Sequence, residues 1–346
     1  SPSEVSTIKI FGQGGMPLSE VASVGMNNQM IEQPVIVRTK STGELDAVLF
    51  YASGASGFEY NPLSKTIGHV VNPYSKDNYY VLTYGGAAGK RAVEDDAPGT
   101  IVNRPTSCTA RVYNEEEVVN AFTAGSGRTW FGRSVDNALP QVFTTSLPNL
   151  SRSGNIFYRY SLAHRAPTDG SFTISENGTM LGKIRLPGLG GGSINYYDAY
   201  ALTGNGTLPA TSIAGDGRSV LKFAYAAENG STSAAGLMNW FEIHYPQECV
   251  AHNNTIEFYT DLEVSGGTEY TINGFSGEIF GFDVTDRSSP KVVKNFSTTG
   301  GVFVLRTDIA AARPKRFYLS SQIKTPRLES TDVANLRTGY ANTDVI

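Results

Sequence analysis

Cysteine and histidine, the residues that make up a thiol-based catalytic centre, are few in this chain. Its 346 residues include two cysteines and four histidines, and Cys249 lies between His244 and His252. A cysteine nucleophile needs a neighbouring base that accepts the thiol proton, which makes a cysteine–histidine dyad one interpretation. The chain has neither a His-Glu-x-x-His nor a Gly-x-Ser-x-Gly motif, and no third group that would orient the imidazole is evident. The alternative is that these residues end a strand and form the turn after it.

Carboxylates gather in three places, at residues 94–96, at residues 115–117, and at Asp283 with Asp286. None of these groups has the spacing of a calcium-binding loop. A solvated loop explains the first group, and the positive end of a helix explains the second. Asp283 and Asp286 flank a strand end, where aspartate commonly accepts hydrogen bonds from its own turn. A metal site there is the alternative, but we predict no resident metal and no cofactor.

Two cysteines, Cys108 and Cys249, are too few for a disulfide-stapled scaffold. They form either one long-range bridge in an oxidising compartment or two unrelated buried thiols. The sequence leaves both possibilities open.

The charge of the chain excludes a nucleic-acid partner, and its hydropathy excludes a membrane-spanning helix. The chain carries 28 Lys and Arg against 32 Asp and Glu, a net charge of -4, so no basic footprint for nucleic acid is present. No run of 18 apolar residues could span a membrane as a helix. No signal-peptide pattern is visible at the start of the sequence.

The elements that must position these side chains are predicted to be β-strands. Apolar and polar residues alternate with period two, the pattern of half-buried antiparallel strands, and Asn-Gly pairs such as 177–178 and 205–206 supply turn signals between them. We predict an all-β chain of two or more antiparallel β-sandwiches, jelly-roll or immunoglobulin-like. The clearest strands are at residues 156–162, 221–225, 255–259, 302–305 and 316–319.

Helix is predicted in two short places, over residues 114–124, with Asn114 as the cap, and over residues 308–312. The glycine run at 188–192 is interpreted as a hairpin tip, since no phosphate-loop residues follow it. We divide the chain into an N-terminal β domain (1–105), a second β-sandwich region that could hold two sub-units (106–325), and a linker (326–346).

Several segments together resemble the N-terminal, β-rich region of gingipain-like cysteine peptidases, specifically the PorU-type sortases of the type IX secretion system. The similarity runs in order along nearly the whole chain. The matching segments are IKIFGQGGMPL (8–18), ELDAVLFYASG (44–54), NPYS with YYVLT (72–75 and 79–83), SGRTWFG (126–132), FDVTD (282–286) and YANTDVI (340–346). Two positions depart from the family pattern, with Arg133 in place of glutamate and Arg287 in place of proline.

The resemblance implies that this region is not itself catalytic. The family's catalytic cysteine and histidine fall in a later caspase-like domain, so neither Cys108 nor Cys249 inherits the role. The chain would shield or orient that domain in an exported protein at the cell surface or outer membrane of a Gram-negative bacterium. Its partners would be the downstream catalytic domain, secreted cargo proteins and secretion-system subunits.

Motif residues are the site candidates under this hypothesis. They are Ser126, Gly127, Arg128, Trp130, Phe131, Asp283 and Asp286. Gly127 and Gly132 would let Trp130 and Phe131 fold inward, while Arg128 pairs with a carboxylate or with carbonyls. The segment is either a structural latch or a contact with the peptidase domain.

Two further hypotheses come from other functional classes. Two tyrosine pairs, Tyr79–Tyr80 or Tyr196–Tyr197 next to the glycine run, could serve as platforms for sugar rings in a carbohydrate-binding or adhesive module. A free-standing hydrolase using His244, Cys249 and an acid is the third possibility.

Overall fold

A computed structural model of the chain describes residues 2–15, 30–118, 129–136, 139–188, 200–228 and 235–330. The part described is built of antiparallel sheets, so the predicted all-β class is confirmed. The described residues contain one α-helix, the short α1 (Pro2–Val5), and one 3-10 turn, η1 (Ala210–Ser212). No helix in the described ranges is long and apolar enough to cross a bilayer.

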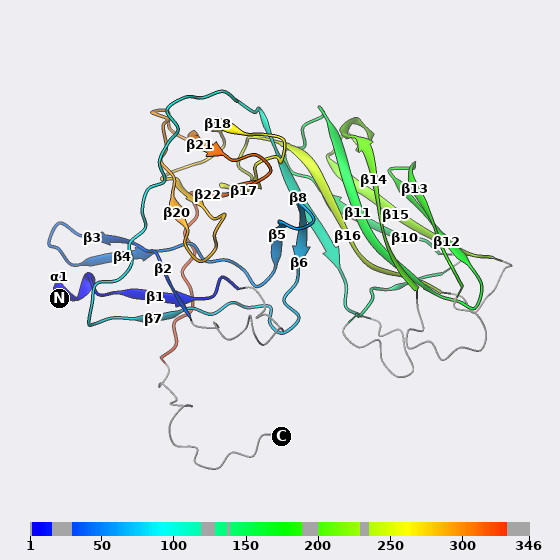
Figure 1. Ribbon diagram of the computed structural model, residues 1–346, viewed down its shortest axis with the longest axis horizontal. Coiled ribbons are helices and arrows are strands. Elements are labelled where there is room, and N and C mark those ends of the chain that lie inside the picture. Colours follow the sequence, from blue (N-terminus) through cyan, green and yellow to red (C-terminus); the bar gives the residue numbers. More distant parts are fainter. Residues whose placement is uncertain are drawn as a thin grey trace, which may run out of the picture.

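The distal sandwich, on the right of Figure 1, packs two sheets face to face. One sheet has the order β10 (Gln141–Ser146), β15 (Arg218–Ala227), β12 (Gly170–Glu176) and β13 (Thr179–Leu186). The facing strands are β14 (Tyr200–Pro209), β11 (Asn155–Arg165), β16 (Ala235–Glu248) and β8 (Ser107–Glu115), with β9 (Ser134–Val135) beside β16. Alternate side chains of both sheets, including Tyr158, Tyr160, Phe172, Phe223 and Phe241, fill one core.

The proximal unit continues the same large sheet beyond β8. Its strands follow in the order β17 (Thr255–Tyr259), β22 (Arg316–Ser320), β19 (Phe280–Asp283) and β20 (Lys291–Val292). The pair β18 (Gly266–Ile272) and β21 (Phe303–Ile309) covers this part of the sheet. A second core, with Phe258, Tyr270, Phe303 and Phe317 at its centre, lies between the two layers.

The N-terminal segment adds three small sheets to the proximal unit. They are the triple β2 (Ile31–Gln33), β1 (Lys9–Gly12) and β7 (Val81–Thr83), and the hairpins β3 (Ile36–Thr39)–β4 (Leu45–Leu49) and β5 (Gly57–Asn61)–β6 (Thr66–Val70). Tyr51 packs with Phe282 and Val284 of the proximal unit. Gly14 and Gly15 have positive φ values, 73° and 79°, a backbone conformation that glycine adopts without strain.

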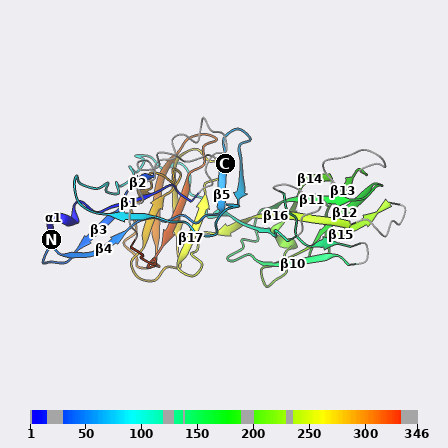
Figure 2. The ribbon, with the colours of Figure 1, turned by 90° about the horizontal axis from the view of Figure 1, so that it is seen from below.

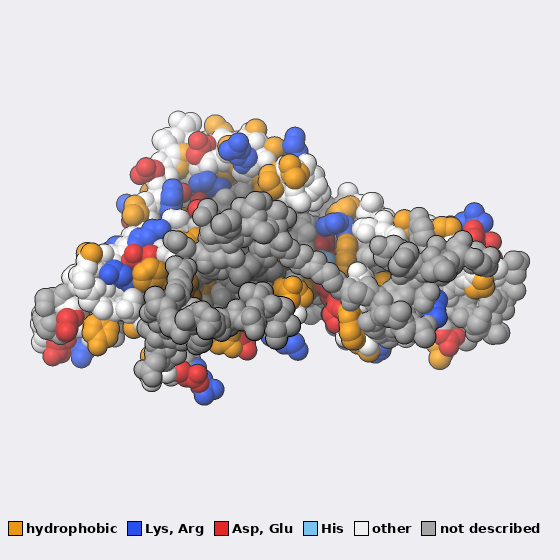
Figure 3. Space-filling view, turned by 60° about the horizontal axis from the view of Figure 1, so that its bottom comes forward, with side chains coloured by type: hydrophobic (Ala, Val, Ile, Leu, Met, Phe, Trp, Pro, Cys, Tyr) orange, Lys and Arg blue, Asp and Glu red, His pale blue; other side chains and the backbone are white. Residues whose placement is uncertain are grey.

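The molecule is elongated because the two cores lie one after the other along the long strands β8 and β16 (Figure 2). Figure 3 shows acidic and basic side chains interspersed over one face, without a continuous basic patch among its described atoms. The predicted boundaries at residues 105 and 325 stay a prediction.

Both predicted helices are wrong where the structure describes them. Asn114 and Glu115 extend strand β8, since they pair with Phe241 and Trp240 of β16, and residues 119–124 lie outside the described residues. Asp308 belongs to β21, where it pairs with Gly267. Sheet pairing therefore overrides local helix signals in both places.

One predicted turn is also wrong, because Asn205 and Gly206 lie inside β14. A Cβ atom on Gly206 would stand 2.7 Å from the side chain of Leu181, so glycine here serves close packing between the two sheets. The segments 189–192 and 340–346 lie outside the described residues.

Candidate functional site

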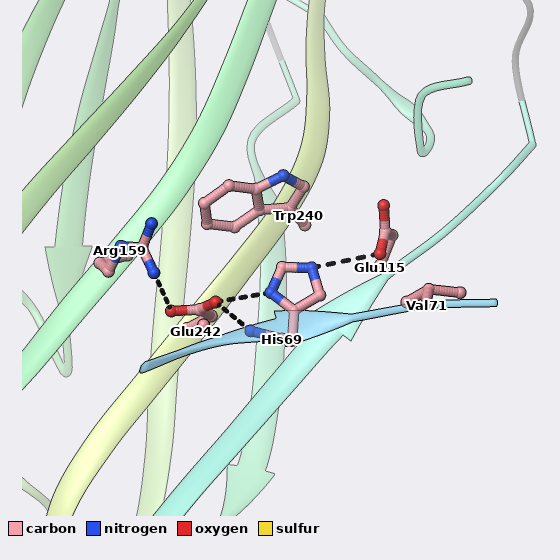
Figure 4. A pocket seen from close by; sticks show the side chains of 7 residues that line it. His69, Val71, Glu115, Arg159, Trp240 and Glu242 are labelled. Atoms are coloured by element: carbon pink, nitrogen blue, oxygen red, sulfur yellow. Dashed lines mark hydrogen bonds and ion pairs between the residues drawn. The ribbon is translucent and has the colours of Figure 1, made fainter. Parts of the chain in front are cut away.

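A cavity of about 300 Å³ lies where the β5–β6 hairpin meets the long strands (Figure 4). Histidine, glutamate, arginine and tryptophan side chains from four strands converge on it. Its lining residues are Gly68, His69, Val71, Glu115, Arg159, Trp240 and Glu242. We treat this cavity as the candidate functional site because it gathers more ionisable groups than any of the predicted motifs.

Glu242 of β16 is the centre of the site and is 1% exposed. Its Oε1 accepts hydrogen bonds from Nδ1 of His69 at 2.6 Å and from the His69 backbone N–H at 2.8 Å. Its Oε2 accepts from Nη1 of Arg159 at 2.9 Å and from Nε2 of His244 at 3.0 Å. Burial alone would raise the pKa of Glu242, but the hydrogen bonds from His244 and His69 hold it far below its usual range. Glu242 is therefore a permanent buried anion.

His69 of β6 is held between two carboxylates. Besides Glu242, its Nε2 donates to Glu115 of β8 at 3.2 Å, and its ring stacks on Tyr113 at 4.8 Å between centroids. Burial lowers the pKa of His69, yet the hydrogen bonds to Glu115 and Glu242 outweigh it and raise the pKa to about 9. Both ring nitrogens then carry protons at neutral pH, and the side chain is an imidazolium.

His244 is uncharged, unlike His69, although both histidines donate a hydrogen bond to Glu242. Burial lowers its pKa, and the nearby Arg111 and Arg159 oppose the effect of Glu242. It is a neutral imidazole that donates from Nε2. Its ring meets Phe58 of the hairpin edge-on, with centroids 5.9 Å apart.

The local sequence explains how the hairpin fits against the strands. Gly68 precedes His69, and a Cβ atom there would stand 3.0 Å from Nη1 of Arg159, so a larger residue would push the guanidinium away. At the hairpin tip, Oδ1 of Asn61 accepts from the backbone N–H groups of Leu63 and Ser64. The hairpin thus presents His69 to two partners that β8 and β16 bring side by side.

The charged groups of the cavity form a proton-dependent clamp. Each charged group of the lining pairs with a neighbour. Within the described residues, no group of three or more histidine, cysteine, aspartate or glutamate side chains could hold a metal ion. The clamp ties the hairpin to the distal sandwich.

The clamp should make stability depend on pH in the alkaline range. Since the folded pKa of His69, about 9, exceeds the value near 6.5 of an unfolded histidine, the stabilisation is complete below about pH 6.5 and is lost as pH rises through 9. We expect urea unfolding to show wild type more stable than His69→Asn at pH 6, with the difference shrinking toward pH 10. The control His252→Asn alters an exposed turn residue that contacts Asn253 and no carboxylate of the clamp, so the effect of His69→Asn can be compared with that of removing a histidine elsewhere. A constant difference for His69→Asn would contradict the clamp.

The residues of the hypothetical cysteine–histidine dyad do not form one. His244 contacts Glu242, His252 is exposed and contacts Asn253, and Cys249 is buried beside Cys108. Both thiols are free.

The SGRTWFG motif is described only in part, since Ser126, Gly127 and Arg128 lie outside the described residues. Phe131 is buried with Ala163 and Leu237, whereas Trp130 is 41% exposed. The expectation that both aromatic rings fold inward is therefore wrong for Trp130.

The backbone around the motif explains why the chain turns there. The N–H of Gly132 donates to the carbonyl of Met238 at 2.7 Å, leaving no room for a Cβ atom. Arg133, which departs from the family pattern, forms a two-pronged pair with Glu116 at 3.0 and 2.8 Å.

Asp283 and Asp286 serve the turn after β19. Asp283 accepts from both the N–H and the hydroxyl of Thr285 and lies 3.3 Å from Nζ of Lys315. Asp286 accepts from the N–H and hydroxyl of Ser288. The turn-capping interpretation agrees with this geometry.

Sequence reasoning missed the role of Arg287, the second departure from the family pattern. Its guanidinium donates to the carbonyl of Gly14 at 3.2 Å and pairs with Glu59 of the β5–β6 hairpin. It therefore joins the N-terminal glycine motif to the proximal unit. Asp95 also pairs with Lys291 and Lys315, so residue 95 does not lie in a merely solvated loop.

The tyrosines of the sugar-platform hypothesis do not form a pair where they are described. Tyr79 is 73% exposed, but Tyr80 packs edge-on against Phe50, and its hydroxyl accepts from the N–H of Ser53 at 3.0 Å. Tyr196 and Tyr197 lie outside the described residues.

Comparison with known proteins gives a relationship in fold. No protein family and no curated protein sequence matches the chain. Among solved structures, the chain is similar to the dimeric latent form of PorU from Porphyromonas gingivalis, with a TM-score of 0.73 and 18% sequence identity. The chain shares a PorU-like fold. The match covers 91% of this chain and 29% of the PorU chain, so the similarity concerns a minor part of PorU. At this identity, the likeness shows the fold alone.

Proposed function

We propose that this chain is the non-catalytic β-rich region of a gingipain-like cysteine peptidase that processes the C-terminal signals of cargo proteins during type IX secretion. In this role it orients or shields a caspase-like peptidase domain encoded after it, with residues 326–346 as the connection. The observation that carries the proposal is the PorU-like fold, which accounts for 91% of this chain but only 29% of PorU.

The state of the cysteines supports a non-catalytic role. A peptidase of this class needs a thiolate, a base within hydrogen-bond reach and donors for the developing oxyanion. Here Cys249 is buried in the same packed cluster as Cys108, and the predicted base, His244, is hydrogen-bonded to Glu242.

The rest of the proposal concerns location and partners. We place the protein at the cell surface or outer membrane of a Gram-negative bacterium, with cargo proteins and secretion-system subunits as partners. Trp130, exposed beside the anchored Phe131, is the described motif residue best placed to contact the peptidase domain.

A peptidase assay tests the proposal directly. We expect the 346-residue chain to hydrolyse no fluorogenic peptide above the buffer rate in the presence of a reducing agent, and Cys249→Ala to behave like wild type. Turnover that requires a thiol and disappears in Cys249→Ala would overturn it. A parent reading frame that encodes no peptidase domain would overturn it independently.

A further inference from the structure

The two cysteines lie at the neck of the molecule, which we define as the place where the chain enters and leaves the distal sandwich. Cys108 is the second residue of β8, and Cys249 directly follows the last residue of β16. Cys108 pairs across the ladder with Gln247, and Cys249 lies two residues after Gln247, in the bend that follows β16. The ends of the two paired strands therefore bring the cysteines close together.

The thiols are neighbours inside the proximal core. Cys108 and Cys249 are 4% and 6% exposed and belong to one cluster of packed side chains. The interaction between the two thiols raises the pKa of Cys108 and lowers that of Cys249. This direction favours Cys249 as the nucleophile.

Of the two cysteines, only Cys249 lines a cavity. A cavity of about 470 Å³ opens beside the neck, and its lining includes Arg104, Thr106, Glu248 and Cys249 but not Cys108. A small molecule that enters this cavity can meet Cys249, whereas Cys108 is not part of the lining.

We propose that Cys108 and Cys249 are a redox-active pair that forms a reversible disulfide across the neck, with Cys249 as the attacking and Cys108 as the resolving thiol. The oxidant is a small disulfide, R–S–S–R. Cys249 thiolate attacks one sulfur, forming a mixed disulfide and releasing one R–S⁻. Cys108 then attacks the Cys249 sulfur and releases the second R–S⁻. The two thiol protons pass to the released thiolates, so the protein is oxidised and R–S–S–R becomes two R–SH.

The bond would close a loop that contains the entire distal sandwich. Cross-linking removes conformational freedom from the unfolded chain, and the effect grows with loop length. We expect the oxidised protein to unfold at a Tm higher by on the order of 5 °C. Reduction with dithiothreitol should reverse the increase.

Cystamine, a small aliphatic disulfide, is the probe for the test. Native wild-type protein should lose both free thiols, carry no adduct and yield one peptide in which Cys108 is bonded to Cys249. Cys108→Ser, which lacks the resolving thiol, should retain a stable cysteamine adduct at Cys249. Cys249→Ser should stay unmodified, because Cys108 is not reachable from the cavity.

Three results would overturn the proposal. The first is native wild-type protein that keeps both thiols although unfolded protein is oxidised by the same reagent. The second is a lasting adduct on wild-type Cys249, which would show that Cys108 does not resolve it. The third is an adduct on Cys108 in Cys249→Ser. The wild-type experiment decides the question even if a variant fails to fold.

Discussion

Glu242→Gln is expected to lower the free energy of unfolding by about 3 to 5 kcal/mol, the usual cost of removing one partner from a buried ion-pair cluster. The amide would leave Arg159 without its counter-ion and His69 with only the more distant Glu115. His69 would then lose much of the stabilisation of its charged form. Urea denaturation at pH 7 measures the loss, and hydrogen exchange should show faster exchange at residues 57–70.

A matched control separates burial from the loss of charge. Glu228 forms an ion pair with Arg185, but its side chain is 48% exposed. Glu228→Gln should cost less than 1 kcal/mol, because exposed pairs contribute little. Equal effects of the two substitutions would show that the Glu242 cluster does not clamp the hairpin.

Arg316→Met is the second substitution with a large expected effect, a loss of about 2 to 3 kcal/mol. Arg316 of β22 is 5% exposed, and its Nη1 lies 3.0 Å from Glu59 of the hairpin while its Nε lies 2.6 Å from Glu257 of β17. Its guanidinium also lies over the ring of Tyr259. The loss should be smaller than for a fully buried pair, since the side chain of Glu257 is 40% exposed and Arg287 still neutralises Glu59.

The control for Arg316 is Arg218→Met, which removes a pair with Asp216 in which the arginine side chain is 60% exposed. We expect a much smaller change there than at Arg316, because exposed pairs contribute little. Thermal or urea unfolding measures both variants. An effect at Arg316 no larger than at Arg218 would mean that the hairpin gains nothing from this pair.

Much of the fold could be predicted from the sequence because strand alternation is a local signal. The strand predicted at residues 255–259 coincides with β17, and the one at 316–319 lies within β22. The predicted helix is wrong at residues 114–118 for a physical reason. Three consecutive glutamates after an asparagine favour a helix start, but the ladder from Ser107 to Glu115 against β16 gains more from pairing and burial.

The candidate site could not be predicted as a whole, since its partners are brought together by strand order. His69 and Glu242 are 173 positions apart, and no local pattern states that a hairpin from the first segment lies against β16. One signal was available. Glu242 and His244 are two positions apart in a strand and must share a face, which indicates Glu242 rather than Cys249 as the partner of His244.

The course of β8 and β16 has an evolutionary consequence. The chain leaves the proximal unit along β8 and returns along its neighbour β16. The distal sandwich, on the right of Figure 1, is therefore topologically an insertion into the proximal unit. Joining those two strands earlier by a tight turn would excise the distal sandwich without rerouting anything else. The distal sandwich could therefore be gained, lost or exchanged during evolution while the proximal unit keeps its architecture.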